Sequence, residues 1–335
     1  MVGTSKSNDD DTLEVIGQLQ NMSTVDNIVT ICANCGKEGA KNICNKCNVA
    51  RYCNAVCKKI HKKKHKKDCE EHVRHAAEKH NEDLRRAAEL HDIELFKQPP
   101  PKEDCPICFQ QLPLLNTGYR YQTCCGKVIC SGCDYAPVFD NQGNKVDNEK
   151  CPFCRTPHSK SAEEEVERQK KRVEARDPLA IHKLGIFYSE GTYGYPKDYS
   201  KALELYHQAA KLGYAAAYTN IGYAYHFGEG AEVDKKMAVY YYELAAMKGS
   251  TPARYNLGTL EDDEDNFDRA LKHYMIAIRG GESKSLGIIK EMYLQGDATK
   301  DDYTIALRSY QSYLSEIKSD QRDEAAAADD RFRYY

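Results

Sequence analysis

The sequence predicts two small zinc-stabilised modules followed by an all-α solenoid of helical repeats. All 15 cysteines lie between Cys32 and Cys154, where they form two dense clusters of closely spaced pairs. Beyond Asp177 the sequence repeats itself at intervals of 32 or 36 residues. Charged residues make up 30% of the chain and hydrophobic residues 41%. This composition suits small domains and solvated helices better than one large core.

Composition and charge exclude several classes of protein. A net charge of -3 does not suit a polycation built for nucleic acid, and no run approaches the 18 apolar residues of a membrane-spanning helix. The first residues are acidic and lack the apolar segment of a secretory signal. In a chain without such a signal, paired cysteines bind metal far more often than they form disulfides. We therefore expect an intracellular protein of the cytoplasm or nucleus, with neither membrane nor nucleic acid as its partner.

The pattern divides the chain into successive segments. Glu, His, Arg and Ala predict a helix after the first cysteine cluster, and a run of three prolines ends it. The expected segments are a disordered N-terminus (1–31), a first zinc finger (32–69), a charged helix with a proline-rich spacer (70–104), a second zinc finger (105–157), a charged linker helix (158–176), helical repeats (177–314) and a charged C-terminal tail (315–335).

The first cluster offers two complete sets of zinc ligands. It contains seven cysteines, paired at short spacings, and one histidine spaced like an eighth ligand. A tetrahedral zinc ion takes four nitrogen or sulfur ligands, and a Cys-x2-Cys turn supplies two of them. Because so small a segment cannot build a stable apolar core, we expect each metal site to supply about 10 kcal/mol of folding free energy. The eight expected ligands are Cys32, Cys35, Cys44, Cys47, Cys53, Cys57, His65 and Cys69.

This cluster resembles a MYND-type zinc finger. The resemblance rests on the two Cys-x2-Cys pairs, the Tyr-Cys step at 52–53 and the terminal His-Lys-x2-Cys motif that begins at His65. His61 competes with His65 by chemistry, but only His65 has this context. The resemblance implies interleaved ligation, with Cys32, Cys35, Cys53 and Cys57 on one zinc ion and Cys44, Cys47, His65 and Cys69 on the other.

The same resemblance also suggests which molecules this finger binds besides zinc. MYND modules are known to bind proline-containing peptides, which implies such a partner here. Lys58 and Lys62 stand where the family usually carries Gln and Trp, and the chain contains no Trp. The lysines between 58 and 67 form either a nucleic-acid or nuclear-import patch or the solvated face of the helix that carries His65. We favour the solvated face, because acidic residues follow at 68–71 and no aromatic residues are interleaved to stack on bases.

The second cluster resembles a RING finger. Its Cys-Pro-Ile-Cys, Cys-Gly-Lys-Val-Ile-Cys and Cys-Pro-Phe-Cys-Arg motifs, which begin at Cys105, Cys125 and Cys151, stand where that family has its ligands. Lys127 occupies the usual position of a His, so we expect Cys124 to join Cys125 as a ligand. The cross-brace of the family implies one zinc ion on Cys105, Cys108, Cys130 and Cys133 and another on Cys124, Cys125, Cys151 and Cys154. With these, 15 cysteines and His65 fill four tetrahedral sites, and we expect four zinc ions per chain.

The RING resemblance implies a ubiquitin-ligase role without covalent chemistry and without a catalytic residue of its own. Such a ligase docks a ubiquitin-conjugating enzyme and holds its thioester-linked ubiquitin in a reactive pose. The resemblance assigns enzyme docking to Ile107 and Pro152 and the linchpin role to Arg155, whose planar guanidinium can hydrogen-bond both partners. The alternative is that Ile107 and Pro152 only shape the zinc knuckles and that Arg155 is a surface charge. The usual Trp before the last cysteine pair is absent.

The repeats predict pairs of packed helices. A Gly-x2-Tyr motif begins at Gly185 and Gly222, and an Ala-x3-Tyr motif recurs four times between 202 and 310. Small residues let the two helices approach closely, and Gly213 and Gly249 suit the left-handed position after a helix end. The pattern resembles the Sel-one-like repeat, a relative of the tetratricopeptide repeat. That resemblance implies a concave surface that binds proteins.

Three hypotheses for function follow. The leading one is a RING-type ubiquitin ligase whose repeats, together with the first finger, select the client. The second is a non-enzymatic scaffold whose modules all bind protein, and the third is a chromatin-associated regulator that uses the lysine run. An autoubiquitination assay separates the first two hypotheses, and salt-dependent retention on DNA would support the third.

Overall fold

The computed structural model describes most of the chain. The described residues are 31–100, 103–113, 117–136, 138–139, 142, 145–146 and 149–334. They divide into two compact units between Leu90 and His91. Apart from Ile31, the N-terminal segment that the sequence predicts to be disordered lies outside the described residues.

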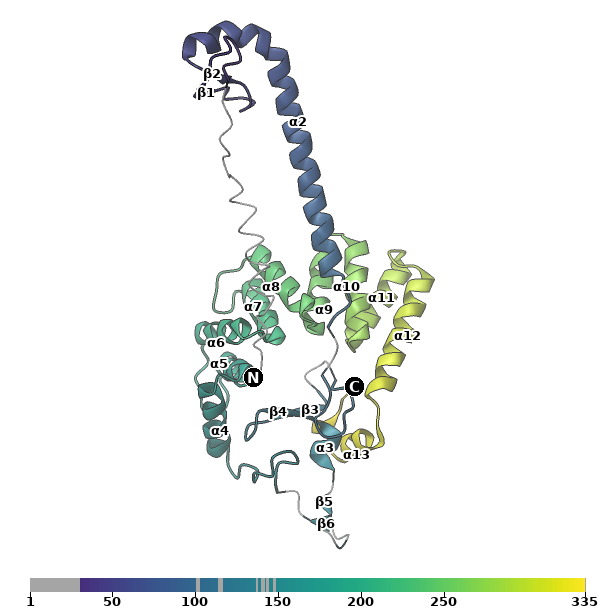
Figure 1. The fold of residues 1–335 in the computed structure, drawn as a ribbon. Coiled ribbons are helices and arrows are strands. Elements are labelled where there is room, and N and C mark those ends of the chain that lie inside the picture. Colours follow the sequence, from purple (N-terminus) through teal and green to yellow (C-terminus); the bar gives the residue numbers. More distant parts are fainter. Residues whose placement is uncertain are drawn as a thin grey trace. The chain divides into compact units, whose positions relative to one another are not determined.

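The first unit holds the first cysteine cluster and most of a long helix (Figure 1). Two short strands, β1 (Asn42–Ile43) and β2 (Arg51–Tyr52), pair antiparallel. Tyr52 is buried among the cysteines, so this unit has a core of sulfur and one aromatic ring. Helix α2 (Ala55–Leu95) carries the last ligands of the cluster and continues without a break into the predicted charged helix. Ion pairs such as that of Arg74 with Glu78 follow its exposed surface.

The second unit contains the second cysteine cluster, which is built on short elements. Strands β3 (Tyr119–Gln122) and β4 (Lys127–Cys130) form an antiparallel hairpin, and α3 (Ser131–Tyr135) follows directly. Strands β5 (Val138–Phe139) and β6 (Lys145–Val146) form a second small hairpin.

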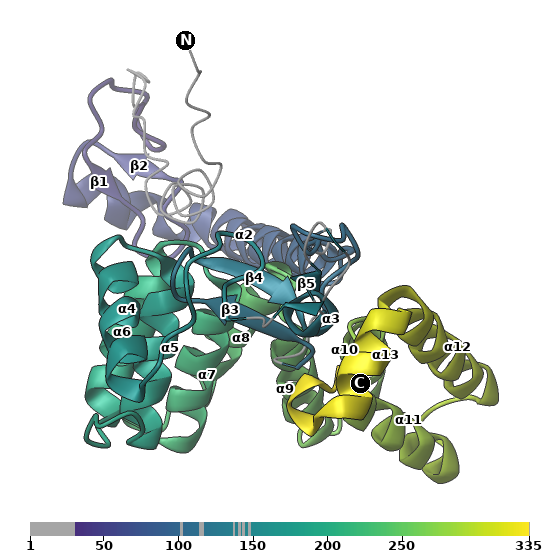
Figure 2. The same ribbon diagram turned by 90° about the horizontal axis from the view of Figure 1, so that it is seen from below.

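The remainder of the second unit is a helical-repeat solenoid, which confirms the predicted fold class. A linker helix, α4 (Ala162–Glu174), comes first. The helices that follow it pack in pairs, and the two helices of each pair are consecutive in the sequence and run in opposite directions (Figures 1 and 2). The pairs are α5 (Pro178–Glu190) with α6 (Tyr199–Lys211), α7 (Ala215–Phe227) with α8 (Lys235–Met247), α9 (Thr251–Asp262) with α10 (Phe267–Arg279), and α11 (Ser283–Gln295) with α12 (Lys300–Ile317).

Glycine and tyrosine explain why the repeat motif is so regular. In three successive pairs, a glycine of the first helix faces a tyrosine ring of the second. A Cβ atom on the glycine would lie 2.5 or 2.6 Å from a ring carbon, closer than real contacts allow. The pairs are Gly185 with Tyr206, Gly222 with Tyr242, and Gly258 with Tyr274. The predicted left-handed glycines are confirmed as well, because Gly213 and Gly249 have φ values of 85° and 89° just past the helix ends.

The end of helix α2 belongs to the core of the second unit. Leu95 is fully buried against residues of α8 and α9, and its carbonyl oxygen accepts a hydrogen bond of 2.5 Å from Nη2 of Arg254. The positive charge of Arg254 at the C-terminal end of α2 also interacts favourably with the dipole of that helix. Asp92 accepts two hydrogen bonds from Arg269, at 2.6 and 2.7 Å. These contacts anchor the residues just before the proline-rich spacer.

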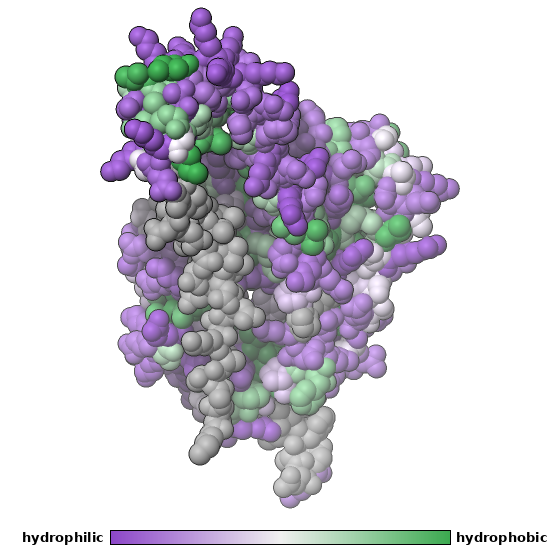
Figure 3. All heavy atoms as spheres, turned by 45° about the horizontal axis from the view of Figure 1, so that its top comes forward, coloured by the Kyte–Doolittle hydropathy of each residue, from purple (hydrophilic) through white to green (hydrophobic). Residues whose placement is uncertain are grey.

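The segment from 315 to 335, predicted as a charged tail, contains ordered helices. Helix α12 continues to Ile317, α13 spans Asp320–Ala328, and a short 3-10 helix, η1, covers Asp330–Phe332. Helix α13 packs on α3 of the second cluster. The face of the molecule in Figure 3 is mostly hydrophilic, with apolar residues in small patches. Among the described helices, none combines the length and apolar character needed to cross a bilayer.

Candidate metal centres

Four of the five Cys-x2-Cys pairs adopt the same tight turn, and the fifth, Cys130 and Cys133, lies at the start of helix α3. The residue directly after each of the four pairs has a positive φ, and its backbone N–H donates a hydrogen bond of 2.9 Å to the carbonyl oxygen of the first cysteine. These residues are Gly36, Asn48, Phe109 and Arg155, with φ values of 72°, 52°, 57° and 64°. The turn directs both thiols to one side, so each pair presents two ligands to a single metal ion. The two clusters therefore use the same local architecture.

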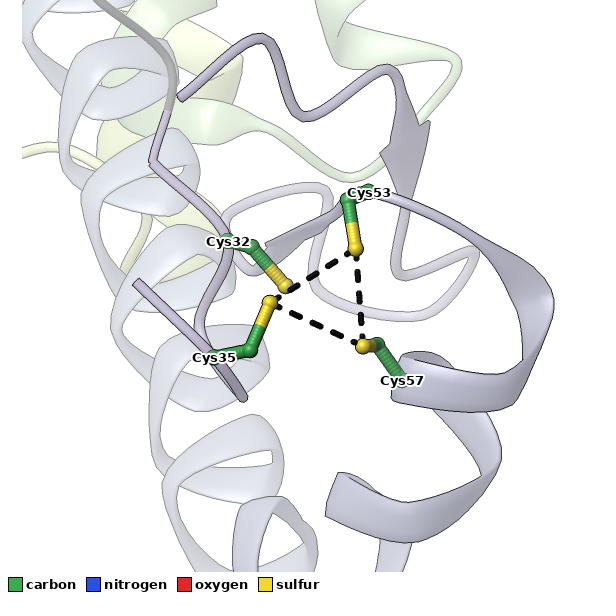
Figure 4. Close-up of side chains that lie close together, drawn as sticks. All are labelled: Cys32, Cys35, Cys53 and Cys57. Atoms are coloured by element: carbon green, nitrogen blue, oxygen red, sulfur yellow. Dashed lines mark hydrogen bonds between the residues drawn. The ribbon is translucent and has the colours of Figure 1, made fainter. Parts of the chain in front are cut away.

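The first site brings together Cys32, Cys35, Cys53 and Cys57 (Figure 4). The sulfur of Cys53 lies 3.7 Å from that of Cys35 and 3.4 Å from that of Cys57, and Cys35 and Cys57 are 3.8 Å apart. Ligand sulfurs about 2.3 Å from a tetrahedral zinc ion lie about 3.8 Å from one another. The observed separations fit such an ion, and they are much longer than a disulfide bond.

The second site resolves the competition between the two histidines. Nε2 of His65 lies 3.3 Å from the sulfur of Cys47, and the sulfurs of Cys44 and Cys69 are 3.7 Å apart. His61 instead turns its Nδ1 to the hydroxyl of Tyr52, 3.4 Å away. The backbone N–H of Cys47 lowers the pKa of the Cys44 thiol to about 6, which favours the thiolate that zinc requires. The structure thus brings His65, and not His61, to the cysteines.

The third site consists of Cys105, Cys108, Cys130 and Cys133, and all of these except Cys108 are buried, with at most 5% exposed. The sulfurs of Cys108 and Cys130 are 3.7 Å apart. A hydrogen bond from the thiol of Cys130 lowers the pKa of Cys105 to about 4. The hydrogen bond to Cys105 and burial raise the pKa of Cys130, and a hydrogen bond between its side chain and Arg322 of α13 opposes that rise. A fully buried guanidinium therefore lies beside this set of sulfurs.

The fourth site contains the adjacent cysteines of the β3–β4 turn, Cys124 and Cys125, with Cys151 and Cys154. The sulfur of Cys154 lies 3.4 Å from that of Cys124, and those of Cys125 and Cys151 are 4.0 Å apart. Burial opposes ionisation of Cys154, but hydrogen bonds from Thr156 prevail and lower its pKa to about 6. The turn therefore directs two neighbouring thiols toward one centre.

The chemistry of these donor sets is compatible with zinc. In each group the four ligand atoms lie within 4.8 Å of one another, and all cysteines in the described chain are free thiols. Three groups offer four sulfurs, and one offers three sulfurs and an imidazole nitrogen. Sites with four protein ligands leave no open position for a substrate, so their role is to stabilise the fold rather than to catalyse a reaction.

The predicted docking residues lie on the knuckles of the second cluster. Ile107 is 36% exposed, Pro152 is half-buried and Arg155 is exposed. Sequence reasoning missed their apolar neighbours Phe109 and Phe153, which are 78% and 43% exposed. Their exposure could have been predicted from their position, because Phe109 directly follows a cysteine pair and Phe153 lies inside one. Such tight turns bury little side-chain surface.

Sequence reasoning also missed the residues that hold the second cluster on the repeats. The hydroxyl of Tyr121 donates a hydrogen bond of 2.8 Å to Asp177, which caps helix α5 and pairs with Arg172 at 2.8 Å. The ammonium of Lys183 lies 4.9 Å from the centre of the Tyr121 ring. Gly126 has no Cβ, and one would overlap the guanidinium of Arg172. The cluster is therefore packed tightly on the first repeat.

Two family models match parts of the chain. The MYND finger model matches residues 32–69, and the Sel1 repeat model matches residues 178–214 and 215–250. The second cluster lies outside both matches. The chain therefore combines a MYND finger with Sel1 repeats, which generally mediate protein–protein interaction.

Individual relatives match shorter stretches. Over 149 residues the chain is 33% identical to an uncharacterized protein of Neisseria meningitidis. This match covers 44% of this chain and 31% of that protein. Over 56 residues the chain is 39% identical to the E3 ubiquitin-protein ligase DA2 of Arabidopsis thaliana. This match covers 17% of this chain and 12% of the ligase. A solved Sel1 repeat protein from Oxalobacter formigenes is 32% identical, with a TM-score of 0.42, and covers 47% of this chain and 66% of that one. The chain spans less than a third of the length of the curated relatives it matches.

Proposed function

We propose that this chain is a RING-type ubiquitin ligase in which the second cluster captures a ubiquitin-conjugating enzyme. The observation that carries the proposal is the exposed surface of two knuckles of that cluster. One knuckle offers Ile107 and Phe109, and the other offers Phe153 and Arg155. Large apolar side chains beside an arginine are typical of the centre of a protein interface.

The packing of the second cluster supports this assignment. Its β3–β4 hairpin is held by the first repeat through Tyr121 and Asp177, and α3 is covered by α13. The two knuckles keep their apolar side chains exposed to solvent. The ligase DA2, which matches over 56 residues, adds a relative whose name carries this activity. In the proposed division of labour, the Sel1 repeats and the MYND finger select the protein client.

The remaining parts of the proposal concern metal, domains and compartment. We propose four structural zinc ions, one on each of the four ligand groups, because each group offers a complete tetrahedral set. We propose that the boundaries predicted for the two fingers and the repeats are those of the functional modules. We also propose an intracellular location, in the cytoplasm or nucleus, because reduced thiols persist there.

The test is discharge of ubiquitin from a loaded conjugating enzyme, measured with the zinc-loaded full chain and a broad panel of such enzymes. We expect Ile107→Ala to weaken capture of the enzyme, and Arg155→Ala to slow discharge while zinc content and folding stay intact. Arg176→Ala is the matched control, because Arg176 is also exposed and also has a positive φ, of 57°. Val49→Ala, on a knuckle of the first cluster, is the control for Ile107→Ala.

A non-enzymatic scaffold is the second candidate, favoured by the two matched modules. A MYND finger and Sel1 repeats together indicate a protein-interaction scaffold. Absence of discharge by the wild-type chain with every conjugating enzyme of the panel would favour the scaffold. Equal discharge by the wild type and Arg155→Ala would remove the linchpin role of that arginine only.

A further inference from the structure

A groove of about 720 Å³ lies between the second cluster and the repeats of the second unit. The second cluster contributes Tyr119 and Val128 from its hairpin, and the facing wall comes from α5, α6, α7 and the loop after α8. Deep, partly apolar recesses between packed modules are the usual places where proteins bind ligands. The groove shares none of the sixteen metal ligands and none of the exposed knuckle residues.

Five tyrosines and a histidine contribute aromatic rings to the lining of this groove. Tyr206 and Tyr214 flank the buried His182, whose ring centre lies 5.5 and 5.0 Å from theirs. Tyr223 stands at the outer edge, where it is 44% exposed and packs on Phe227 at 4.4 Å. Flat, rigid rings suit proline side chains and guanidinium groups, which both pack on aromatic faces.

The charged residues of the groove are mostly acidic. Glu103 and Glu190 line it with exposed carboxylates and Glu229 with a half-buried one, while Lys248 is the positively charged residue among the described lining residues. Burial raises the pKa of Tyr214, and Tyr119 and Glu103 add to the rise. His182 adds no positive charge near neutral pH, because burial lowers its pKa to about 4.

The chain already packs its own prolines along one wall. Pro99 and Pro100, from the spacer after helix α2, line the groove beside Gly249. Gly249 has a φ of 89°, and a Cβ atom there would lie 3.2 Å from Cγ of Pro100. The glycine thus lets Pro100 lie close to the repeat backbone.

We propose that this groove binds an extended peptide of a partner protein that combines prolines with an arginine. The prolines would pack on the tyrosine rings beside the chain's own Pro99 and Pro100. The arginine would stack on the exposed Tyr223 ring and pair with Glu190 or Glu229. This inference goes beyond the proposed function, since binding of such a peptide requires no ubiquitin transfer.

The test measures fluorescence anisotropy of the zinc-loaded full chain with fluorescein-labelled peptides of the form Ala-Pro-Pro-Xaa-Pro-Pro-Ala. We expect saturable binding with Arg at the central position and binding about tenfold weaker with Ala there, with Glu weaker still. The double variant Glu190→Gln/Glu229→Gln should lose the preference for Arg. Tyr223→Ala, at an exposed position where folding is not at risk, should weaken binding of the Arg peptide.

Two substitutions outside the groove serve as matched controls. Tyr240→Ala removes a tyrosine of similar exposure, 42%, and Glu204→Gln removes a carboxylate that pairs with Lys201. Both should bind the Arg peptide like the wild type. Absence of saturable binding, equal affinity for the three peptides, or unchanged binding by Tyr223→Ala would each overturn the proposal.

Discussion

Arg322 donates a hydrogen bond of 2.8 Å from Nη2 to the backbone carbonyl oxygen of Gln111, across 211 residues of sequence. Its Nη1 donates to the carbonyl oxygen of Ile317 at 2.6 Å, and its side chain also contacts Cys130, a candidate ligand of the third site. The side chain is fully buried. Gly132 of α3, where a Cβ would lie 3.0 Å from the backbone nitrogen of Arg322, permits this close approach. Arg322 of the C-terminal segment therefore anchors the second cluster through contacts with Gln111, Cys130 and Gly132.

We expect Arg322→Met to destabilise the second cluster. The carbonyl oxygen of Ile317 would lose this donor in a buried place and that of Gln111 in a half-buried one, which costs about 1–3 kcal/mol. A site of four thiolates and one Zn²⁺ ion also carries net negative charge, which Arg322 offsets. Denaturant unfolding and the rate at which a chelator removes zinc from the full chain measure both effects. Arg331→Met, which removes an exposed arginine of the same segment, should change neither.

The contact between Gly222 and the Tyr242 ring makes a separate prediction about the repeats. Alanine at 222 would place a Cβ atom 2.6 Å from the ring, so we expect a loss of about 1–3 kcal/mol in unfolding free energy. Gly287 of α11 is the matched control, because no atom lies within 4 Å of the corresponding Cβ position. Gly287→Ala should stabilise the helix by about 0.5–1 kcal/mol. Equal effects of the two substitutions would contradict this account of the repeat motif.

The cysteine turns and the repeat helices could be predicted because both depend on the spacing of residues that are close in sequence. Four of the five Cys-x2-Cys pairs form the same tight turn, so eight of the candidate ligands follow from this spacing. The glycine and tyrosine of each repeat lie on consecutive helices, and their recurrence showed which residues pack together. The choice between His61 and His65 depended on family context. In the structure, Nε2 of His65 lies 3.3 Å from the sulfur of Cys47, whereas His61 contacts Tyr52.

What could not be predicted depends on contacts between distant parts of the chain. No local pattern shows that Arg322 reaches Gln111, or that Tyr121 binds the helix cap Asp177. A buried arginine and an exposed one look the same in sequence, since burial depends on what packs around them. For the same reason the segment from 315 to 335 was expected only as a charged tail. The groove between the second cluster and the repeats also forms only when these distant contacts are made.

Metal removal should affect the two kinds of structure differently. We expect a chelator to unfold both cysteine clusters, because coordination supplies their folding free energy, while the repeats stay helical through their apolar packing. The melting temperature of the repeats should nevertheless fall, since the support from Tyr121 to Asp177 is lost. Far-UV circular dichroism and thermal unfolding of the full chain, before and after chelation, measure this. Elemental analysis beforehand should approach four zinc ions per chain, and collapse of helicity would contradict the modular interpretation.

Acid should destabilise the repeats through His182. Burial lowers the pKa of this imidazole from the ordinary 6.5 to about 4, and its Nε2 lies 3.1 Å from the side-chain amide of Asn220. Because the pKa is depressed in the folded state, the contribution of the neutral imidazole is present above pH 6.5. It is lost as the pH falls from about 6.5 to about 4, by up to about 3 kcal/mol.

We therefore expect His182→Gln to flatten the dependence of unfolding free energy on pH within that window. Denaturant unfolding of the wild type and the variant at matched pH values, in the same zinc-containing buffers, measures the difference. Protonation of the cysteine thiols acts on both proteins and cancels in the comparison. His158→Gln, at an exposed position, should follow the wild-type profile. Parallel profiles for the wild type and His182→Gln would show that the buried imidazole is not the group that titrates.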